Sequence, residues 1–174
     1  MMKRIITILL AMMMVLSLTA CGSSGEGESE KVTNLEDSLS EIIDKIYAEQ
    51  PVEFPVGTIE VDLSDADAVK AYTGLDSTDK IKEATVSESM MGSQAYSLVL
   101  VRLNDANDAE TVANEMKDGI DPAKWICVEA DDLSVVAYGD TVMLIMVGSS
   151  LSVSSEQIVT AFKTVCGGTL SVEL

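Results

Sequence analysis

Histidine is absent from the 174 residues of this sequence. Because histidine is the usual general base near neutral pH and a frequent metal ligand, its absence excludes Ser-His-Asp triads and typical zinc sites. Basic residues are scarce as well, with 11 Lys and Arg against 29 Asp and Glu, which gives a net charge of -18. A chain this acidic repels phosphate backbones, so nucleic acid is excluded as a partner.

What the chain does contain is enough apolar material for a core, since 47% of its residues are hydrophobic and 23% are charged. This balance is typical of a folded domain and not of a disordered chain. The composition changes twice along the sequence, which predicts three parts. We expect a signal peptide over residues 1–20, a flexible tether over 21–33 and one globular domain over 34–174.

The N-terminus has the plan of an export signal. Lys3 and Arg4 precede an apolar run over residues 5–18. This run is too short to cross a bilayer comfortably, which takes about 20 residues, but it fits the apolar core of a secretory signal. The run ends in the stretch Leu18-Thr19-Ala20-Cys21.

This stretch resembles the lipobox of bacterial lipoproteins, in which an aliphatic residue and two small residues precede a cysteine. The resemblance implies cleavage between Ala20 and Cys21 and a diacylglyceryl group on the Cys21 thiol. It also implies attachment to the extracytoplasmic face of the cell membrane through that lipid. The alternative is that an ordinary signal peptidase removes the leader and Cys21 is incidental. The next ten residues, GSSGEGESEK, contain no apolar side chain and predict a solvated tether.

The rest of the chain alternates helical and strand patterns. Strands are expected around 56–63, 83–90 and 94–103, with the last in the centre of a sheet because both of its faces are apolar. Gly139-Asp140 between two apolar runs predicts a two-residue hairpin. Helices are expected over 35–47 with Asn34 as the cap, over 64–72 ending at Gly74, after Asp105 or Asp108, and after a Ser154/Gln157 capping box. The order ββαββα behind an N-terminal helix predicts an α+β fold, mainly an antiparallel sheet with helices packed on a face.

A wider resemblance rests on Tyr72-Thr73-Gly74-Leu75-Asp76, the segment ESMMGSQAYSLVLVRL, the helix start NDANDAETV and the hairpin YGDTVMLIMV. These segments look like the uncharacterised lipoproteins of Gram-positive, clostridia-type bacteria that carry domain of unknown function 4358. The similarity covers roughly residues 50–166, with Thr73 inserted and Leu75 in place of isoleucine. It implies an exported module with no established activity, and so no catalytic residues to carry over.

No motif predicts an active site, a metal site or a cofactor. Ser77 and Lys80 match the S-x-x-K nucleophile motif of penicillin-binding enzymes, but the K-T-G partner motif is absent. The run Asp105 to Asp108 lacks the glycine and closing glutamate of a calcium loop, so helix capping explains it better. A looser acidic cation site stays open as an alternative, and its candidate ligands are Asp62, Asp65, Asp67, Asp131 and Asp132.

Two cysteines are left once Cys21 carries a lipid. Cys127 and Cys166 form an even pair in an exported domain, which permits a disulfide. The alternative is two buried free thiols, because both cysteines lie in apolar segments. A catalytic thiol is disfavoured, since neither has a basic neighbourhood.

The sequence therefore predicts a lipid-anchored protein whose domain binds an envelope protein or a small ligand and is not an enzyme. A small cell-envelope hydrolase that uses carboxylates or Ser77 is one alternative. Another is an accessory subunit of a membrane complex that docks through the helix over residues 35–47.

Overall fold

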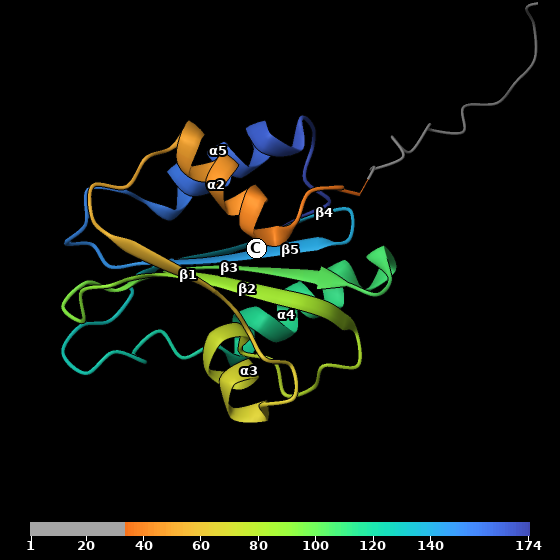
Figure 1. Ribbon diagram of the computed structural model, residues 1–174, viewed down its shortest axis with the longest axis horizontal. Coiled ribbons are helices and arrows are strands. Elements are labelled where there is room, and N and C mark those ends of the chain that lie inside the picture. The colour runs from red at the N-terminus through yellow and green to blue at the C-terminus, as the bar shows by residue number, and fades with distance from the viewer. Residues whose placement is uncertain (1–33) are drawn as a thin grey trace, which may run out of the picture. The chain divides into compact units, whose positions relative to one another are not determined.

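The computed structural model describes residues 34–174, which fold around one six-stranded sheet with two helices on each face (Figure 1). The predicted signal peptide and tether, including Cys21, lie outside the described residues. The elements are α2 Leu39–Glu49, β1 Val56–Glu60, α3 Ala66–Thr73, β2 Ile81–Ser89, β3 Tyr96–Leu103, η1 Ala106–Asp108, α4 Ala109–Gly119, β4 Asp132–Tyr138, β5 Thr141–Val147, α5 Ser155–Cys166 and β6 Val172–Glu173.

The sheet has the strand order β1-β2-β3-β5-β4-β6, and each neighbouring pair is antiparallel. The predicted α+β class is confirmed, and the ββαββα order is found as β2-β3-α4-β4-β5-α5 after α2, β1 and α3. Strand β3 lies near the middle of the sheet, and all eight of its residues are buried, as its two apolar faces predict.

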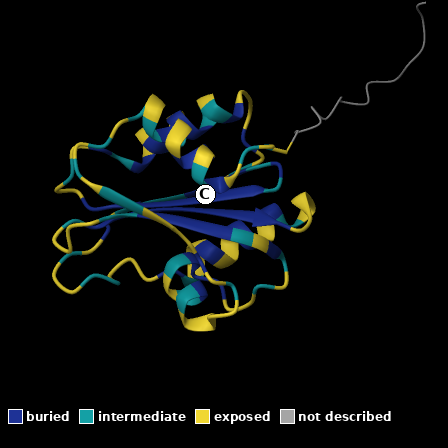
Figure 2. Ribbon diagram, in the orientation of Figure 1, coloured by how far each residue is buried: buried dark blue, intermediate teal, exposed yellow. Residues whose placement is uncertain are grey.

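Helices cover both faces of the sheet. Helices α3 and α4 lie on one face and α2 and α5 on the other, so two apolar cores form on either side of the strands (Figures 1 and 2). Along β3 the side chains alternate between them: Val99 and Val101 enter the α3/α4 core, and Leu98 and Leu100 enter the α2/α5 core. Each of these fully buried side chains contributes about 1.5–3 kcal/mol to folding.

The start of α2 differs from the prediction. Helix α2 begins after Ser38, whose hydroxyl accepts from the backbone N–H of Glu41 while the Glu41 carboxylate accepts from the N–H of Ser38. The predicted cap, Asn34, lies before the helix and accepts a hydrogen bond from the N–H of Asp140. Asn34 is therefore wrong as the cap, because a complete capping box is available four residues later.

Other predicted ends are confirmed. Ser154 and Gln157 form the capping box of α5, and Gly74 ends α3 with a positive φ of 79° that favours glycine. Gly139-Asp140 joins β4 and β5 as the predicted hairpin.

Two elements differ from the prediction. Helix α3 is capped by Asp65 and begins at Ala66, two residues later than predicted. Strand β6, which pairs with β4 through only two residues, was not predicted, because so short a segment carries no pattern.

Candidate binding site

An open groove of about 450 Å³ lies on the α3 side of the sheet. Helix α3 provides one wall, the end of β2 contributes Glu88, and the loop that follows α4 contributes Lys124 and Trp125. Two aromatic rings, one ammonium group and three carboxylates therefore share the groove. Its lining residues are Asp65, Asp67, Ala68, Ala71, Tyr72, Glu88, Lys124 and Trp125.

Lys124 organises the inner part of the groove. Its ammonium nitrogen lies 5.4 Å from the centre of the Tyr72 ring and 5.3 Å from that of Trp125, within cation–π range of both. It also forms an ion pair with Glu88 and donates a hydrogen bond of 3.2 Å to the hydroxyl of Ser97. Because only 15% of its side chain is exposed, this ammonium is a fixed part of the groove.

The charge of the groove is negative at its rim. The opposite charges of Glu88 and Lys124 cancel, so the remaining charge of the groove comes from Asp65 and Asp67 at the start of α3. The Asp65 carboxylate accepts hydrogen bonds from two backbone N–H groups as the helix cap, and both aspartates are exposed. A groove of this kind favours a ligand that carries positive charge beside apolar or aromatic surface.

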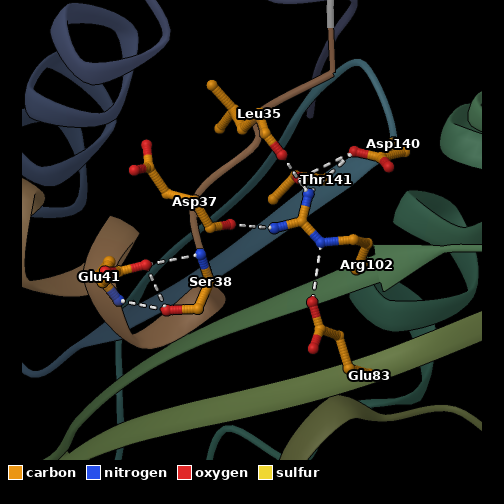
Figure 3. A network of polar contacts seen from close by, with 8 residues as sticks. All are labelled: Leu35, Asp37, Ser38, Glu41, Glu83, Arg102, Asp140 and Thr141. Carbon is orange, nitrogen blue, oxygen red and sulfur yellow. Dashed lines mark hydrogen bonds and ion pairs between the residues drawn. The ribbon is translucent and has the colours of Figure 1, made fainter.

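The chain enters the domain at the other end of the sheet, where Arg102 binds the segment before α2 (Figure 3). The Arg102 guanidinium donates to the carbonyl oxygens of Leu35 at 2.8 Å and Asp37 at 2.6 Å, and it pairs with Glu83 and Asp140. Arg102 lies near the end of β3, and Ser97, which contacts Lys124, lies near its start. The five residue-to-residue steps of strand between them span about 16 Å.

Ser77 and Lys80 do not form a catalytic pair. The Ser77 hydroxyl accepts from the backbone N–H of Asp79 and thereby starts the predicted turn. Lys80 donates to the carboxylate of Glu115 on α4 at 2.7 Å, and this ion pair raises the pKa of Lys80. A lysine held in its charged form does not serve as the base that the S-x-x-K motif requires.

The acidic residues proposed as a looser cation site serve separate local roles. Asp62 accepts from the N–H and hydroxyl of Ser64, and Asp131 accepts from the N–H of Ser149. These hydrogen bonds lower the pKa of both carboxyl groups. Asp132 instead binds Ser155 at the start of α5. Among residues 34–174, no group of three or more Asp, Glu or Cys side chains is placed to hold a metal ion.

Cys127 and Cys166 are both free thiols. Cys166 is buried in the α2/α5 core, and burial raises the pKa of its thiol to about 12. Cys127 is exposed, and its neighbours Trp125 and Val128 pack against the α3/α4 core on the opposite face. The expectation of two buried thiols is therefore wrong for Cys127.

The apolar face of α2 is used inside the domain. Leu39, Ile42, Ile43 and Ile46 are at most 2% exposed and pack in the α2/α5 core. The outward face carries the exposed acidic residues Glu41, Asp44 and Glu49. The apolar stripe of this helix is therefore not a docking face for another subunit.

Sequence reasoning missed the groove itself. Tyr72 and Trp125 are only partly buried, and both residues line the groove. The available signal was Lys124 beside the only tryptophan of the chain, in a loop that follows Gly119 and contains Pro122. Its contacts with Tyr72 and Glu88 join segments 52 and 36 residues apart, respectively, which no local pattern reveals.

Comparison with known proteins adds no relative. No family model, no curated protein and no solved structure matches this chain. The resemblance to the uncharacterised lipoproteins therefore stays a prediction. In the part of the chain that the structure describes, no helix is long and apolar enough to span a membrane.

Proposed function

We propose that this protein is a lipid-anchored lipoprotein of the extracytoplasmic membrane face whose domain is a non-catalytic binding module. One observation carries the binding role: an open groove in which Tyr72 and Trp125 lie beside the exposed carboxylates of Asp65 and Asp67.

The composition of the groove supports binding in preference to chemistry. Its ammonium is paired with Glu88, and two aspartates face solvent beside two aromatic rings. The exposed carboxylates attract cationic groups, and the aromatic rings add apolar contact surface. The residues proposed for a hydrolase, Ser77 and Lys80, are engaged in a turn and in an ion pair with Glu115.

The anchor is tested by replacing Cys21 with alanine. We expect the Cys21→Ala protein to leave the membrane fraction and to lose incorporation of labelled palmitate, because two acyl chains hold a protein stably and none remain. Cys127→Ala is the matched control and keeps the anchor. Membrane retention of Cys21→Ala would contradict the lipoprotein assignment.

The binding role is tested by photo-crosslinking in intact cells. A photoreactive residue replaces Ala71, which lines the groove, or Asp44, which is exposed on α2 on the opposite face of the sheet. We expect a discrete adduct from position 71 and none of that mass from position 44. Identical adducts from both positions would show that the groove is not the binding surface.

A further inference from the structure

Strand β1 forms one edge of the sheet, and half of its backbone groups point away from it. In the β1–β2 pairing, Val61 donates to the carbonyl of Ala84, and the carbonyl of Pro55 accepts from Met90. Because antiparallel pairing alternates, the odd-numbered residues face β2 and the even-numbered ones face outward. The N–H and C=O groups of Val56, Thr58 and Glu60 therefore line a free edge.

Exposed apolar side chains lie along this edge. Ile59 on β1 is 51% exposed, and Met90 and Met91, in the turn after β2, are 73% and 46% exposed. They are three of the four large hydrophobic side chains that are exposed within residues 34–174. Met90 also packs close to β1, since its Cγ lies 3.6 Å from the position that a Cβ of Gly57 would occupy. An edge strand beside exposed apolar side chains is suited to pairing with another strand.

The charge around the edge selects the kind of strand. Residues 51–68, which contain β1 and the start of α3, hold five acidic residues and no basic residue: Glu53, Glu60, Asp62, Asp65 and Asp67. The nearest basic residue on the neighbouring strand is Lys82, at the start of β2. A second copy of this chain would bring the same acidic segment to the edge and be repelled, whereas a basic segment would be attracted.

The edge continues into the groove. Gly57 pairs with Glu88, so the β1 edge lies next to the residue that holds Lys124. A strand added to β1 would alternate its side chains between the two faces of the sheet. Those on the α3 side would be directed toward Asp65 and Asp67.

We propose that β1 binds an extended, basic segment of another protein as an additional antiparallel or parallel strand, with basic side chains directed toward the carboxylates at the start of α3. This proposal rests on the proposed binding function and names its partner class. It does not depend on the lipid anchor, which fractionation tests separately.

The test uses the full chain in a non-ionic detergent and two dye-labelled, end-blocked peptides of about nine residues. One alternates valine with lysine and the other valine with glutamate. Fluorescence anisotropy should show saturable binding of the lysine peptide, weakened by added salt, and none of the glutamate peptide. Equal binding of both peptides, or of neither, overturns the proposal.

A matched pair of variants isolates the backbone of the edge. Glu60→Pro removes both the charge and one outward N–H, whereas Glu60→Gln removes the charge and keeps the N–H. We expect a few-fold loss of affinity in Glu60→Gln and a further loss of about tenfold in Glu60→Pro, the effect of one hydrogen bond. Equal affinities of the two variants, with circular dichroism unchanged, overturn strand addition.

Hydrogen exchange gives a readout that needs no variant. On the wild-type chain, the lysine peptide should slow amide exchange in a fragment that contains residues 56–60. Protection elsewhere and not in this fragment overturns the proposal. Sedimentation that shows a wild-type dimer, which Glu60→Pro converts to monomer, would assign the edge to a second copy and overturns it as well.

Discussion

Arg102 attaches the first described residues of the domain to the sheet. It lies on a strand whose other residues are all apolar or small, and only 6% of it is exposed. A buried charge is tolerated when its donors are satisfied, and Arg102 donates to Glu83, Asp140, Thr141 and two backbone carbonyls (Figure 3). Those carbonyls belong to residues 35 and 37, so the guanidinium ties the entering chain to the sheet.

Replacing Arg102 with methionine tests this role. Arg102→Met leaves the Asp140 carboxylate, which is only 15% exposed, without its guanidinium, and it frees the segment before α2. We expect a loss of about 3 kcal/mol in the free energy of unfolding, measured by urea titration followed by Trp125 fluorescence.

Lys45→Met is the control for this change. It removes an exposed ion pair with Asp37 and should cost less than about 1 kcal/mol. A similar small loss in both variants would show that the Arg102 network is not a main source of stability.

At the scale of the element, the two helices on the same face begin by the same rule. Ser38 and Glu41 start α2, and Ser154 and Gln157 start α5, each with a reciprocal pair of hydrogen bonds. The extra residues that the sequence assigned to the start of α2 lie outside the helix, where the carbonyls of Leu35 and Asp37 accept from Arg102 instead of from helical N–H groups.

Ser38→Ala should destabilise the domain by about 1 kcal/mol, because it leaves the N–H of Glu41 without its partner. Thermal unfolding followed by circular dichroism measures the change. Ser40→Ala, inside the first turn, is the control and should be neutral or slightly stabilising, since alanine is the better helix former. Equal losses at both positions would argue against the capping box.

At the scale of the molecule, the α2/α5 core contains several protonated groups. Tyr47 donates to the hydroxyl of Ser87 at 2.9 Å, Thr58 donates to the same hydroxyl at 3.1 Å, and Tyr96 is fully buried nearby in the core. Burial raises the pKa of Tyr47, Tyr96 and Cys166, since each would be charged if it lost its proton.

The domain should therefore lose stability in alkaline solution. The pKa of each group is higher in the folded protein than in the unfolded chain, so the unfolded chain releases its protons at a lower pH. The free energy of unfolding is therefore unaffected below the unfolded thiol pKa of about 8.5, and it falls as the pH rises above that value. Urea midpoints at pH 7, 9 and 10.5 measure the decline.

Tyr47→Phe is the control variant for the alkaline decline. The variant lacks one titrating group, so its urea midpoint should fall less steeply between pH 9 and 10.5 than that of the wild type. An identical slope in the two proteins would show that Tyr47 does not contribute through its proton.

The local sequence determined much of this fold. Gly139-Asp140 specified the hairpin, Ser154 and Gln157 specified the start of α5, and the two apolar faces of residues 96–103 specified a central strand. Such signals suffice because turn conformation, helix capping and side-chain alternation depend on residues a few positions apart.

The tertiary structure alone decided the rest. It shortened α2 through Arg102, added β6, buried Cys166 while leaving Cys127 exposed, and joined Tyr72, Glu88 and Trp125 in one groove. By itself the sequence determined the local elements and predicted an anchor at Cys21. Which side chains meet, and which edge stays free, depended on sheet order and long-range packing, because contacts between distant segments leave no local pattern.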